Sequence, residues 1–453
     1  MNFTVDKQTL EDLNLLGKFT PGSIFSMFNK VQTSGGERLL NQLFKNPLTD
    51  FDAINKRSSL FHYFQGKNLA FPFSHAEFQT VENYLSTGSS TNYPAALLMA
   101  YSKKMQAALL RDERYPALQK GLLATISLLN TLNDFIKLLD EPQPTPFDEE
   151  QQVIQRILTT PSLGKLLKEK TATEFSTAKL AAYDHLLKHT LRSDLEVLLQ
   201  CMYKLDVYLS VAKVSRAQNF NYAKALPKEL QRIATAALWH PALIKGVSNA
   251  VTFTGNNNMI FLTGANMAGK STFMKSLGIA LYLAHMGFPL AAKDLQFSVL
   301  DGIYSSINVP DSLNMGYSHF YAEVLRVKKA AEEVASGKSF LVLFDELFKG
   351  TNVKDAYDAT LSVTNAFAQF RKCFFIISTH IIEVGEALQK TTENVQFAYL
   401  PTLMEGKVPK YTYLLEEGIT TDRQGMLIIE NEGILELLKN KNQQIPEDKI
   451  TIN

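Results

Sequence analysis

Residues 261–278 read FLTGANMAGKSTFMKSLG, and the part from Gly264 to Ser271 has the spacing G-x-x-x-x-G-K-[ST]. In a loop of this kind, backbone N–H groups surround a polyphosphate, the lysine reaches the outer phosphates and the hydroxyl holds Mg²⁺. An apolar run precedes the loop and a helix-like pattern follows it, which is the strand–loop–helix setting that the motif requires. Because a helix N-terminus adds partial positive charge beside a bound phosphate, the stretch predicts a nucleotide site built around Lys270.

The composition is that of an ordinary soluble protein. The chain has 453 residues, of which 45% are apolar and 20% charged, so it is long enough for two or three domains with cores of their own. Lys and Arg total 46 against 45 Asp and Glu, which argues against a strongly basic protein that coats nucleic acid. A small basic excess lies in residues 1–235, so a nucleic acid partner is expected to contact the first half.

Cysteine usage and the N-terminus indicate a reducing, cytoplasmic setting. Cys201 and Cys373 are the only cysteines, which excludes a disulfide framework and a cysteine metal cluster. The N-terminus lacks a basic-then-apolar signal pattern, and no apolar stretch approaches the length of a membrane span. We therefore expect a cytoplasmic protein with no membrane partner.

Helical spacing dominates the first half of the chain. Apolar residues recur at three and four residues through much of 23–62, 95–140 and 149–213, which indicates packed amphipathic helices. Asp50 or Asp52 is placed to cap the helix that follows Pro47.

The composition or the spacing of apolar residues changes at two places in the sequence. Residues 141–150, EPQPTPFDEE, are rich in proline and acid, and we predict a loop there at the tip of an extended arm. Beyond residue 240, short apolar runs alternate with helical segments, which indicates βα units around a largely parallel sheet. The predicted fold class is therefore multidomain, with an all-α domain over residues 1–235 followed by an α/β domain over residues 236–453.

Two acids follow an apolar strand downstream of the phosphate loop. Residues 339–344, SFLVLF, run directly into Asp345 and Glu346. An aspartate at the end of such a strand can hold Mg²⁺ through water, and an adjacent glutamate can polarise the attacking water. Two acids can also merely end a strand, but the phosphate loop upstream favours the catalytic interpretation.

Two further candidates are a histidine and a serine. The apolar residues 374–377 are followed by Ser378, Thr379 and His380. A single histidine is usually structural, but one at the end of the next strand could contact the γ-phosphate. Ser318 opens a helical pattern, where a serine is commonly only an N-cap.

The order of these motifs resembles the MutS family of DNA mismatch-repair ATPases, a branch of the ABC-type ATPases. The family's phosphate loop, TGPNMGGKST, differs from residues 263–272 only at Ala265 and Ala268. Three more family segments are similar to segments of this chain, namely DEIGRGTS to residues 345–352, ATH to residues 378–380 and the signature segment RSTFMVEM to residues 317–324.

The resemblance extends into the first half and covers most of residues 10–440. Residues 31–57 resemble the segment that begins the family's helical core domain. Residues 205–212 resemble its L-D-V-L-x-S-L-A stretch, and residues 239–241 resemble its R-H-P.

The departures from the family concern the parts that read DNA. Mismatch-reading members carry a recognition domain with a Phe-x-Glu wedge and a connector domain, and we expect neither in this chain. Residues 152–195 are too few for the family's β-rich clamp. Residues 418–430 keep only the glycine and the apolar character of the corresponding family segment, although a helical segment near the C-terminus is still expected to support dimerisation.

The resemblance implies an ATPase that forms a homodimer with two composite ATP sites, using ATP and Mg²⁺. It assigns catalysis to Glu346 and His380, and Mg²⁺ binding to Ser271 and Asp345. It assigns nucleotide binding to Gly264, Asn266, Met267, Gly269, Lys270, Ser271, Thr272 and, across the dimer, Ser318.

The expected substrate is DNA that is duplex, mismatched or branched, in mismatch repair or a recombination-related transaction. Four basic residues form a modest cluster on a predicted arm helix, where a solvated face is the alternative reading: Lys103, Lys104, Arg111 and Arg114. The second hypothesis is a conformational motor acting on a ribosome or protein assembly. An ABC transporter subunit is disfavoured, because a long helical half precedes the phosphate loop.

Overall fold

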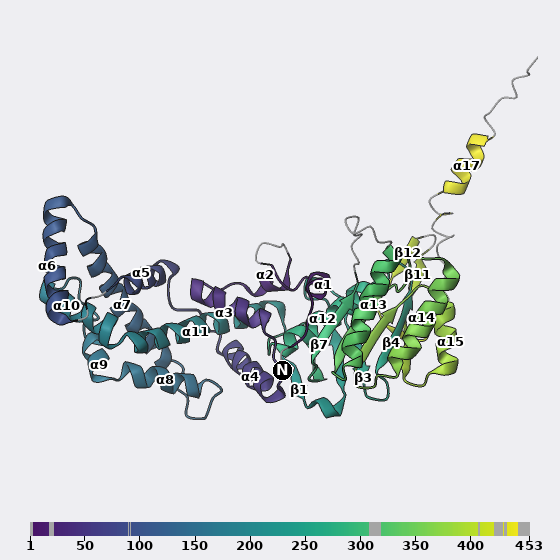
Figure 1. Ribbon diagram of the computed structural model, residues 1–453, viewed down its shortest axis with the longest axis horizontal. Helices are drawn as coiled ribbons and strands as arrows, with labels where there is room; N and C mark the ends of the chain where they lie inside the picture. Colours follow the sequence, from purple (N-terminus) through teal and green to yellow (C-terminus); the bar gives the residue numbers. More distant parts are fainter. Residues whose placement is uncertain are drawn as a thin grey trace, which may run out of the picture.

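The computed structural model describes residues 3–17, 22–88, 90, 92–307, 319–405, 408–420, 429 and 433–442. The molecule is elongated, with a helical half at one end and a half that contains two sheets at the other (Figure 1). Within the described residues, no helix has the length and the apolar content needed to cross a membrane.

The helical half comprises the elements from α2 to α11 and is organised around the longest helix, α11. This helix packs against α3, α4 and α8, and buries more than half of its residues. Asp50 is the N-cap of α4 and accepts a hydrogen bond of 2.8 Å from Ala53 N, which confirms one of the two caps considered from the sequence. The elements are α2 (Ile24–Phe28), α3 (Ser34–Lys45), α4 (Phe51–Lys67), α5 (His75–Ser86), α6 (Tyr93–Leu110), α7 (Arg114–Lys137), α8 (Asp148–Leu158), α9 (Pro161–Leu167), α10 (Thr177–His185), a π-helix (Leu186–Thr190) and α11 (Arg192–Gln218).

The proline-rich stretch 141–150 is not the tip of the arm, so that prediction was wrong. Its acidic start binds α4, because Tyr63 OH donates to Glu141 Oε1 at 3.1 Å and Lys67 forms an ion pair with the same carboxylate. Phe147 is buried, with its ring 5.2 Å from that of Phe64. One apolar side chain in a polar stretch anchors the loop to the core, and α6 occupies the far end of the arm instead (Figure 1).

The sheet half contains a six-stranded sheet in the order β13-β10-β4-β9-β8-β7, parallel except for β13. Alternate side chains of β4, β8 and β9 enter two separate apolar clusters, as expected for parallel strands covered on both faces. The helix α12 covers one face, and α13, α14 and α15 cover the other. The elements are β4 (Met259–Gly264), α12 (Lys270–His285), β7 (Gly302–Ser306), α13 (His319–Ala335), β8 (Phe340–Asp345), α14 (Val353–Ala368), β9 (Phe374–Ser378), α15 (Ile382–Thr391), β10 (Val395–Leu400) and β13 (Glu416–Glu417).

A second, mixed sheet lies beside the first and contains the strands that leave the helical half. Its strands run in the order β1-β6-β2-β3, with β5 paired to β2. Its elements are β1 (Lys224–Leu226), a 3₁₀ turn (Lys228–Leu230), β2 (Ile233–Leu238), β3 (Asn249–Phe253), β5 (Ala292–Lys293) and β6 (Gln296–Ser298), and the remaining elements of this half are the hairpin β11 (Thr402–Glu405) and β12 (Val408–Tyr411) and the helix α17 (Ile434–Asn442). Most of the predicted C-terminal helical segment lies outside the described residues.

The boundary expected at residue 235 falls inside β2, since the strands of the sheet half begin at Lys224. The first helix, α1 (Lys7–Asp12), also belongs to the sheet half because it packs against β7. The sequence of α1 does not show that this helix joins the sheet half. The sheet half therefore takes residues from both sides of the helical half.

The helix α12 joins the two halves. It is apolar on nearly all sides and buried from Phe273 to His285 except for Lys275, the pattern of a helix enclosed by other elements. Tyr282 OH donates to Phe44 O, at the end of α3. The loop that carries the phosphate motif is thus directly attached to the helix that contacts the base of the arm.

His285, at the end of α12, is fully buried at this junction. Its Nδ1 lies 2.7 Å from Leu48 O, and Leu300 N donates to its Nε2 at 3.3 Å, so the ring is the neutral tautomer with hydrogen on Nδ1. Burial lowers the pKa of His285 to about 4. The charged groups that act on it are Lys228, which lowers the pKa further, and Asp301, which raises it.

We expect the free energy of unfolding to fall as the pH falls from 7 to 4, with a contribution of about 3 kcal/mol from His285. The ordinary histidine pKa of 6.5 lies above the folded value of about 4, so between these values the unfolded chain binds the proton and the folded chain does not. The contribution of neutral His285 to the free energy of unfolding is complete above pH 6.5 and is lost as the pH falls toward 4. Urea unfolding at pH 7, 6, 5 and 4 measures it. A His285→Gln variant should show a shallower pH dependence, and an identical slope in both proteins would contradict the assignment.

Candidate functional site

The phosphate loop connects β4 to α12 and adopts the backbone that its glycines allow. Gly264 and Gly269 have φ of 141° and 103°, which L side chains rarely adopt. A Cβ at Gly264 would also lie 3.1 Å from Leu400 O. Met267 has φ of 72° and is largely exposed, so it projects from the loop and does not enter the core.

Lys270 begins α12 and is buried against its own loop. Its Nζ donates to Gly264 O at 2.8 Å and to Ala265 O at 3.2 Å. Burial lowers the pKa of Lys270, while the carboxylates of Glu346 and Asp345 oppose that shift. The ammonium is therefore placed inside the curve of the loop, with two carbonyls as its present partners.

Asp345 ends β8 and accepts hydrogen bonds from two hydroxyls. Ser271 Oγ donates to one carboxylate oxygen and Ser378 Oγ to the other. Ser378 ends β9 and pairs with Asp345 in the register of the parallel strands. The motif serine, the strand aspartate and the serine of the following strand thus meet at one edge of the sheet.

This edge offers the ligands that Mg²⁺ uses beside a nucleotide. Mg²⁺ usually keeps several waters and binds one or two carboxylates together with substrate phosphates. The hydroxyl of Ser271 and the carboxylate of Asp345 fit that requirement. Throughout the part of the chain that the structure describes, no group of three or more His, Cys, Asp or Glu side chains could hold a metal ion, so a metal bound here would take waters or phosphate oxygens as further ligands.

Glu346 follows Asp345 in an uncommon backbone conformation. Its φ is 54°, in the left-handed region that non-glycine residues adopt mainly at turns and functional sites. Its N–H donates to Ser378 O at 3.0 Å, and Lys349 Nζ lies 3.4 Å from Oε2. The left-handed turn directs the chain so that Glu346 lines the cavity over the phosphate loop.

That cavity has a volume of about 810 Å³, within the range of small-molecule sites. Asn266, Met267, Lys270, Ser271 and Thr272 line it together with Glu346. Most predicted nucleotide-binding residues are therefore brought together at one cavity.

The sequence patterns did not predict a second part of the cavity lining, which lies outside the phosphate loop. Its residues come from the segment after β2 and from two later strand ends: Leu238, His240, Leu243, Lys245, Val247, Asn249, Leu400 and Tyr413. Asn249 Nδ2 donates to Tyr413 O at 3.0 Å, which fixes Tyr413 beside the loop. Burial, and secondarily Lys275, lower the pKa of His240. His240 lies in the segment that resembles the family's R-H-P. This resemblance was the only feature of the sequence that pointed to these lining residues.

Gly264 and Asp345 directly precede the lining residues Ala265 and Glu346 but do not themselves line the cavity. Two further predicted residues are not placed there. His380 follows β9 at the same sheet edge, but its side chain is exposed and does not line the cavity. Ser318 lies outside the described residues.

Two family models match the chain. The model of MutS domain III matches residues 8–212, and the model of MutS domain V matches residues 260–447. Domain V is the ATPase region of that family. The first match covers nearly all of the helical half, and the second begins within β4, directly before the phosphate loop.

Proposed function

Because this chain belongs to the MutS family, we propose that it is an ABC-type ATPase that acts on DNA as a homodimer, in mismatch repair or a recombination-related transaction. The observation that carries the proposal is the meeting of Lys270, Ser271 and Glu346 at one nucleotide-sized cavity, with Asp345 bonded to Ser271. The two family matches support an ATPase region joined to a helical core.

Binding of MgATP uses groups that already point into the loop. Lys270 exchanges its two carbonyl partners for the outer phosphates, and the loop N–H groups surround the polyphosphate. Ser271 and Asp345 would hold Mg²⁺, which would neutralise phosphate charge when bound. Leu243, Val247 and Tyr413 provide an apolar wall suited to the base.

Hydrolysis depends on Glu346. Its carboxylate lines the cavity and accepts the proton of the attacking water or orients that water. His380, at the end of the adjacent strand, contacts the γ-phosphate in the closed dimer. Ser318 of the partner subunit completes each site, as the resemblance to ABC-type sites implies.

The contacts of α12 support coupling between the ATP site and the arm. One end of this helix carries Lys270, and the other end bonds to the end of α3 and to Leu48. A change in the phosphate loop is therefore transmitted to the base of the helical half through a single rigid helix.

On the arm, not every residue of the predicted basic cluster is free of an ion pair. Arg114 is paired with Asp112 and donates to Gln106, and Lys104 Nζ lies 5.9 Å from the ring centre of Tyr115. Of the predicted cluster, Lys103, Lys104 and Arg111 form no ion pair within the described residues, although Lys103 also acts electrostatically on Asp112. We propose that these three contact the DNA backbone, without reading bases.

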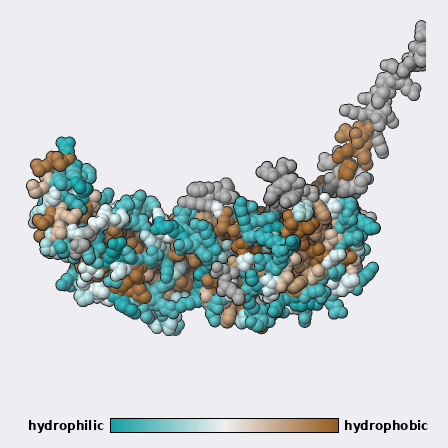
Figure 2. Space-filling model, in the orientation of Figure 1, coloured by the Kyte–Doolittle hydropathy of each residue, from teal (hydrophilic) through white to brown (hydrophobic). Residues whose placement is uncertain are grey.

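The surface of α6 favours a second candidate, an ATP-driven motor on a protein or ribosome assembly. The side of α6 that packs on the arm presents the small residues Ala96 and Ala100. Its opposite side exposes large apolar side chains at helical spacing, Leu98 (73%), Tyr101 (49%), Met105 (63%) and Leu109 (76%). Figure 2 shows this apolar surface at the far end of the arm. Such surfaces are typical of protein contacts.

Fluorescence anisotropy separates the two candidates. We expect Glu346→Gln protein, loaded with ATP, to bind labelled homoduplex, single-mismatch or four-way-junction DNA, because the blocked turnover holds the closed dimer. The affinity should fall as salt rises, since phosphate contacts release counterions. A Lys270→Ala protein is the matched control and should not respond to ATP.

Failure to bind all three DNAs at low salt, in protein shown to bind ATP, would remove the DNA proposal. ATP-dependent co-sedimentation with ribosomes would then test the second candidate.

A further inference from the structure

The helical half contains a pocket with three basic side chains. Lys30 lies in the segment between α2 and α3, and Lys213 and Arg216 lie in the last two turns of α11. All three line a cavity of about 490 Å³, which is in the size range of small-molecule sites. Its described lining residues are all different from those of the ATP cavity, so this is a separate pocket.

Hydrogen bonds hold together the three segments that form the pocket. Thr33 N donates to Asp206 Oδ2 at 2.8 Å, and Gln32 N donates to both oxygens of that carboxylate at 3.0 Å. These bonds join the start of α3 to α11. Arg216 Nη1 donates to Gln65 O at 2.9 Å, which joins the end of α4 to α11. The pocket is therefore formed before any ligand binds.

The lining carries an excess of positive charge. Lys30 and Lys213 are exposed and form no ion pair within the residues that the structure describes. The bond from Arg216 to Gln65 O leaves further N–H donors of the guanidinium for a ligand. Asp206 is the one acid among the described lining residues, and its oxygens already accept the backbone bonds from the start of α3. The pocket therefore favours an anion.

The rest of the lining suits a flat, largely apolar group. Large apolar side chains and two amides line the pocket beside the basic groups: Leu69, Phe71, Leu209, Gln32 and Asn68. The ring centre of Phe71 lies 5.1 Å from that of Phe73, so aromatic packing holds this side chain in place. Aromatic and apolar surfaces bind the face of a nucleobase, and amides bind its edge. Together with the cations, these groups match the chemistry of a nucleotide.

We propose that this pocket binds one nucleoside monophosphate unit, with the phosphate between Lys30, Lys213 and Arg216 and the base against the side of the pocket that contains Phe71. The unit is either a free mononucleotide or one nucleotide of a single strand of nucleic acid, because both present the same groups. A duplex keeps its bases stacked inside and does not present them to such a pocket. The inference goes beyond the proposed function, since it requires neither the ATP cavity nor a second subunit.

The test titrates two probes, AMP and a labelled single-stranded oligonucleotide, into Lys270→Ala protein without Mg²⁺, so that the ATP cavity does not compete. In this protein, a further Lys213→Glu change should weaken the bound probe at least about 10-fold, because a charge-assisted hydrogen bond to phosphate is lost. Lys30→Glu should do the same from the other side of the pocket. The matched control is Lys165→Glu, an exposed position on α9 outside the lining, which changes the net charge equally and should stay within twofold.

Two further measurements exclude simpler explanations. Lys30 and Lys213 are exposed, so their variants should unfold in urea at the same midpoint as Lys165→Glu, and Arg216 is left intact because it holds the end of α4. Matched probes without a base, ribose 5-phosphate and an abasic strand of the same length, should bind at least about fivefold more weakly than AMP and the oligonucleotide, since stacking of the base is lost.

AMP binding that Lys213→Glu weakens and Lys165→Glu keeps would support the site with a free nucleotide as its occupant. The same result with the oligonucleotide alone would support it with a nucleic acid strand. Failure of both probes to bind at low ionic strength would overturn the proposal, as would an unchanged affinity in Lys213→Glu or an equal loss in Lys165→Glu. Equal binding of the probes without a base would overturn the assignment of a nucleotide.

Discussion

Replacing Lys270 with alanine is expected to lower the affinity for ATP by at least about 100-fold and to abolish turnover. A charge-assisted hydrogen bond contributes about 1.5–3 kcal/mol, and loss of two such bonds to the outer phosphates costs about 3–6 kcal/mol, or two to four orders of magnitude in affinity. The alanine also leaves Gly264 O and Ala265 O without the donor that now curves the loop.

Titration with a fluorescent ATP analogue measures this loss. The folded state should persist, because removing a buried ammonium also removes the cost of burying its charge. Lys390→Ala, in the last turn of α15 and away from the cavity, is the control and should bind as the parent does. A dissociation constant for Lys270→Ala within threefold of the parent would show that the loop does not bind phosphate in the proposed way.

Glu346→Gln is expected to bind ATP with the parent affinity and to hydrolyse it about 10²–10⁴-fold more slowly, the usual range for loss of a general base. The amide keeps the size of the side chain, and the bond from the backbone N–H to Ser378 O, which holds the left-handed turn, does not involve the carboxylate. The variant should therefore accumulate ATP-bound dimer.

Phosphate release over time and the mass of the complex by light scattering check both parts of the expectation. Glu383→Gln changes an exposed acid in the first turn of α15 and should leave both quantities unaltered. Hydrolysis by Glu346→Gln at the parental rate would assign the base to another group.

The parts of the site that the sequence predicts are those formed within one strand–loop–helix unit or by neighbouring parallel strands. The glycines and Lys270 follow from a single contiguous motif, and the pairing of Asp345 with Ser378 follows because parallel strands end at the same sheet edge. The local spacing of residues is sufficient to predict both features.

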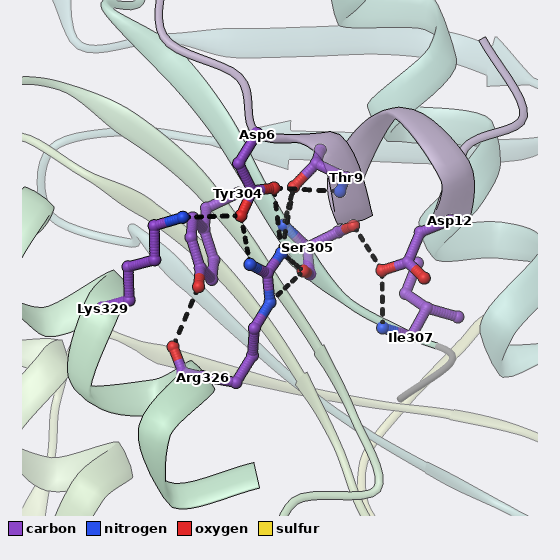
Figure 3. Close-up of polar contacts among 8 residues, drawn as sticks. All are labelled: Asp6, Thr9, Asp12, Tyr304, Ser305, Ile307, Arg326 and Lys329. Atoms are coloured by element: carbon purple, nitrogen blue, oxygen red, sulfur yellow. Dashed lines mark hydrogen bonds and ion pairs between the residues drawn. The ribbon is translucent and has the colours of Figure 1, made fainter. Parts of the chain in front are cut away.

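The part of the cavity lining formed by Leu243 and Tyr413 could not be predicted in this way. These residues lie 170 positions apart in the chain and line the same cavity, where the Asn249 side chain bonds to Tyr413 O. No periodicity specifies such a meeting. The contacts of α1 and its N-cap with β7 and α13 were missed for a related reason. Asp6, Thr9 and Asp12 look like ordinary polar positions on a short helix until Ser305 and Arg326 are seen beside them (Figure 3).

The chain enters the helical half and leaves it at neighbouring points. The chain passes into it after α1 and returns after α11, and the rings of Phe28 and Phe220, near the two crossings, lie 6.3 Å apart. In the order of the chain, the arm is inserted within the sheet half. The elements from α5 to α10 lie beyond α3 and the loop that follows it, which make these contacts with α12 (Figure 1). Their length can therefore change by gain or loss of helical turns without altering the junction. Chains that differ only in the length of the arm can therefore keep the same sheet half and the same junction.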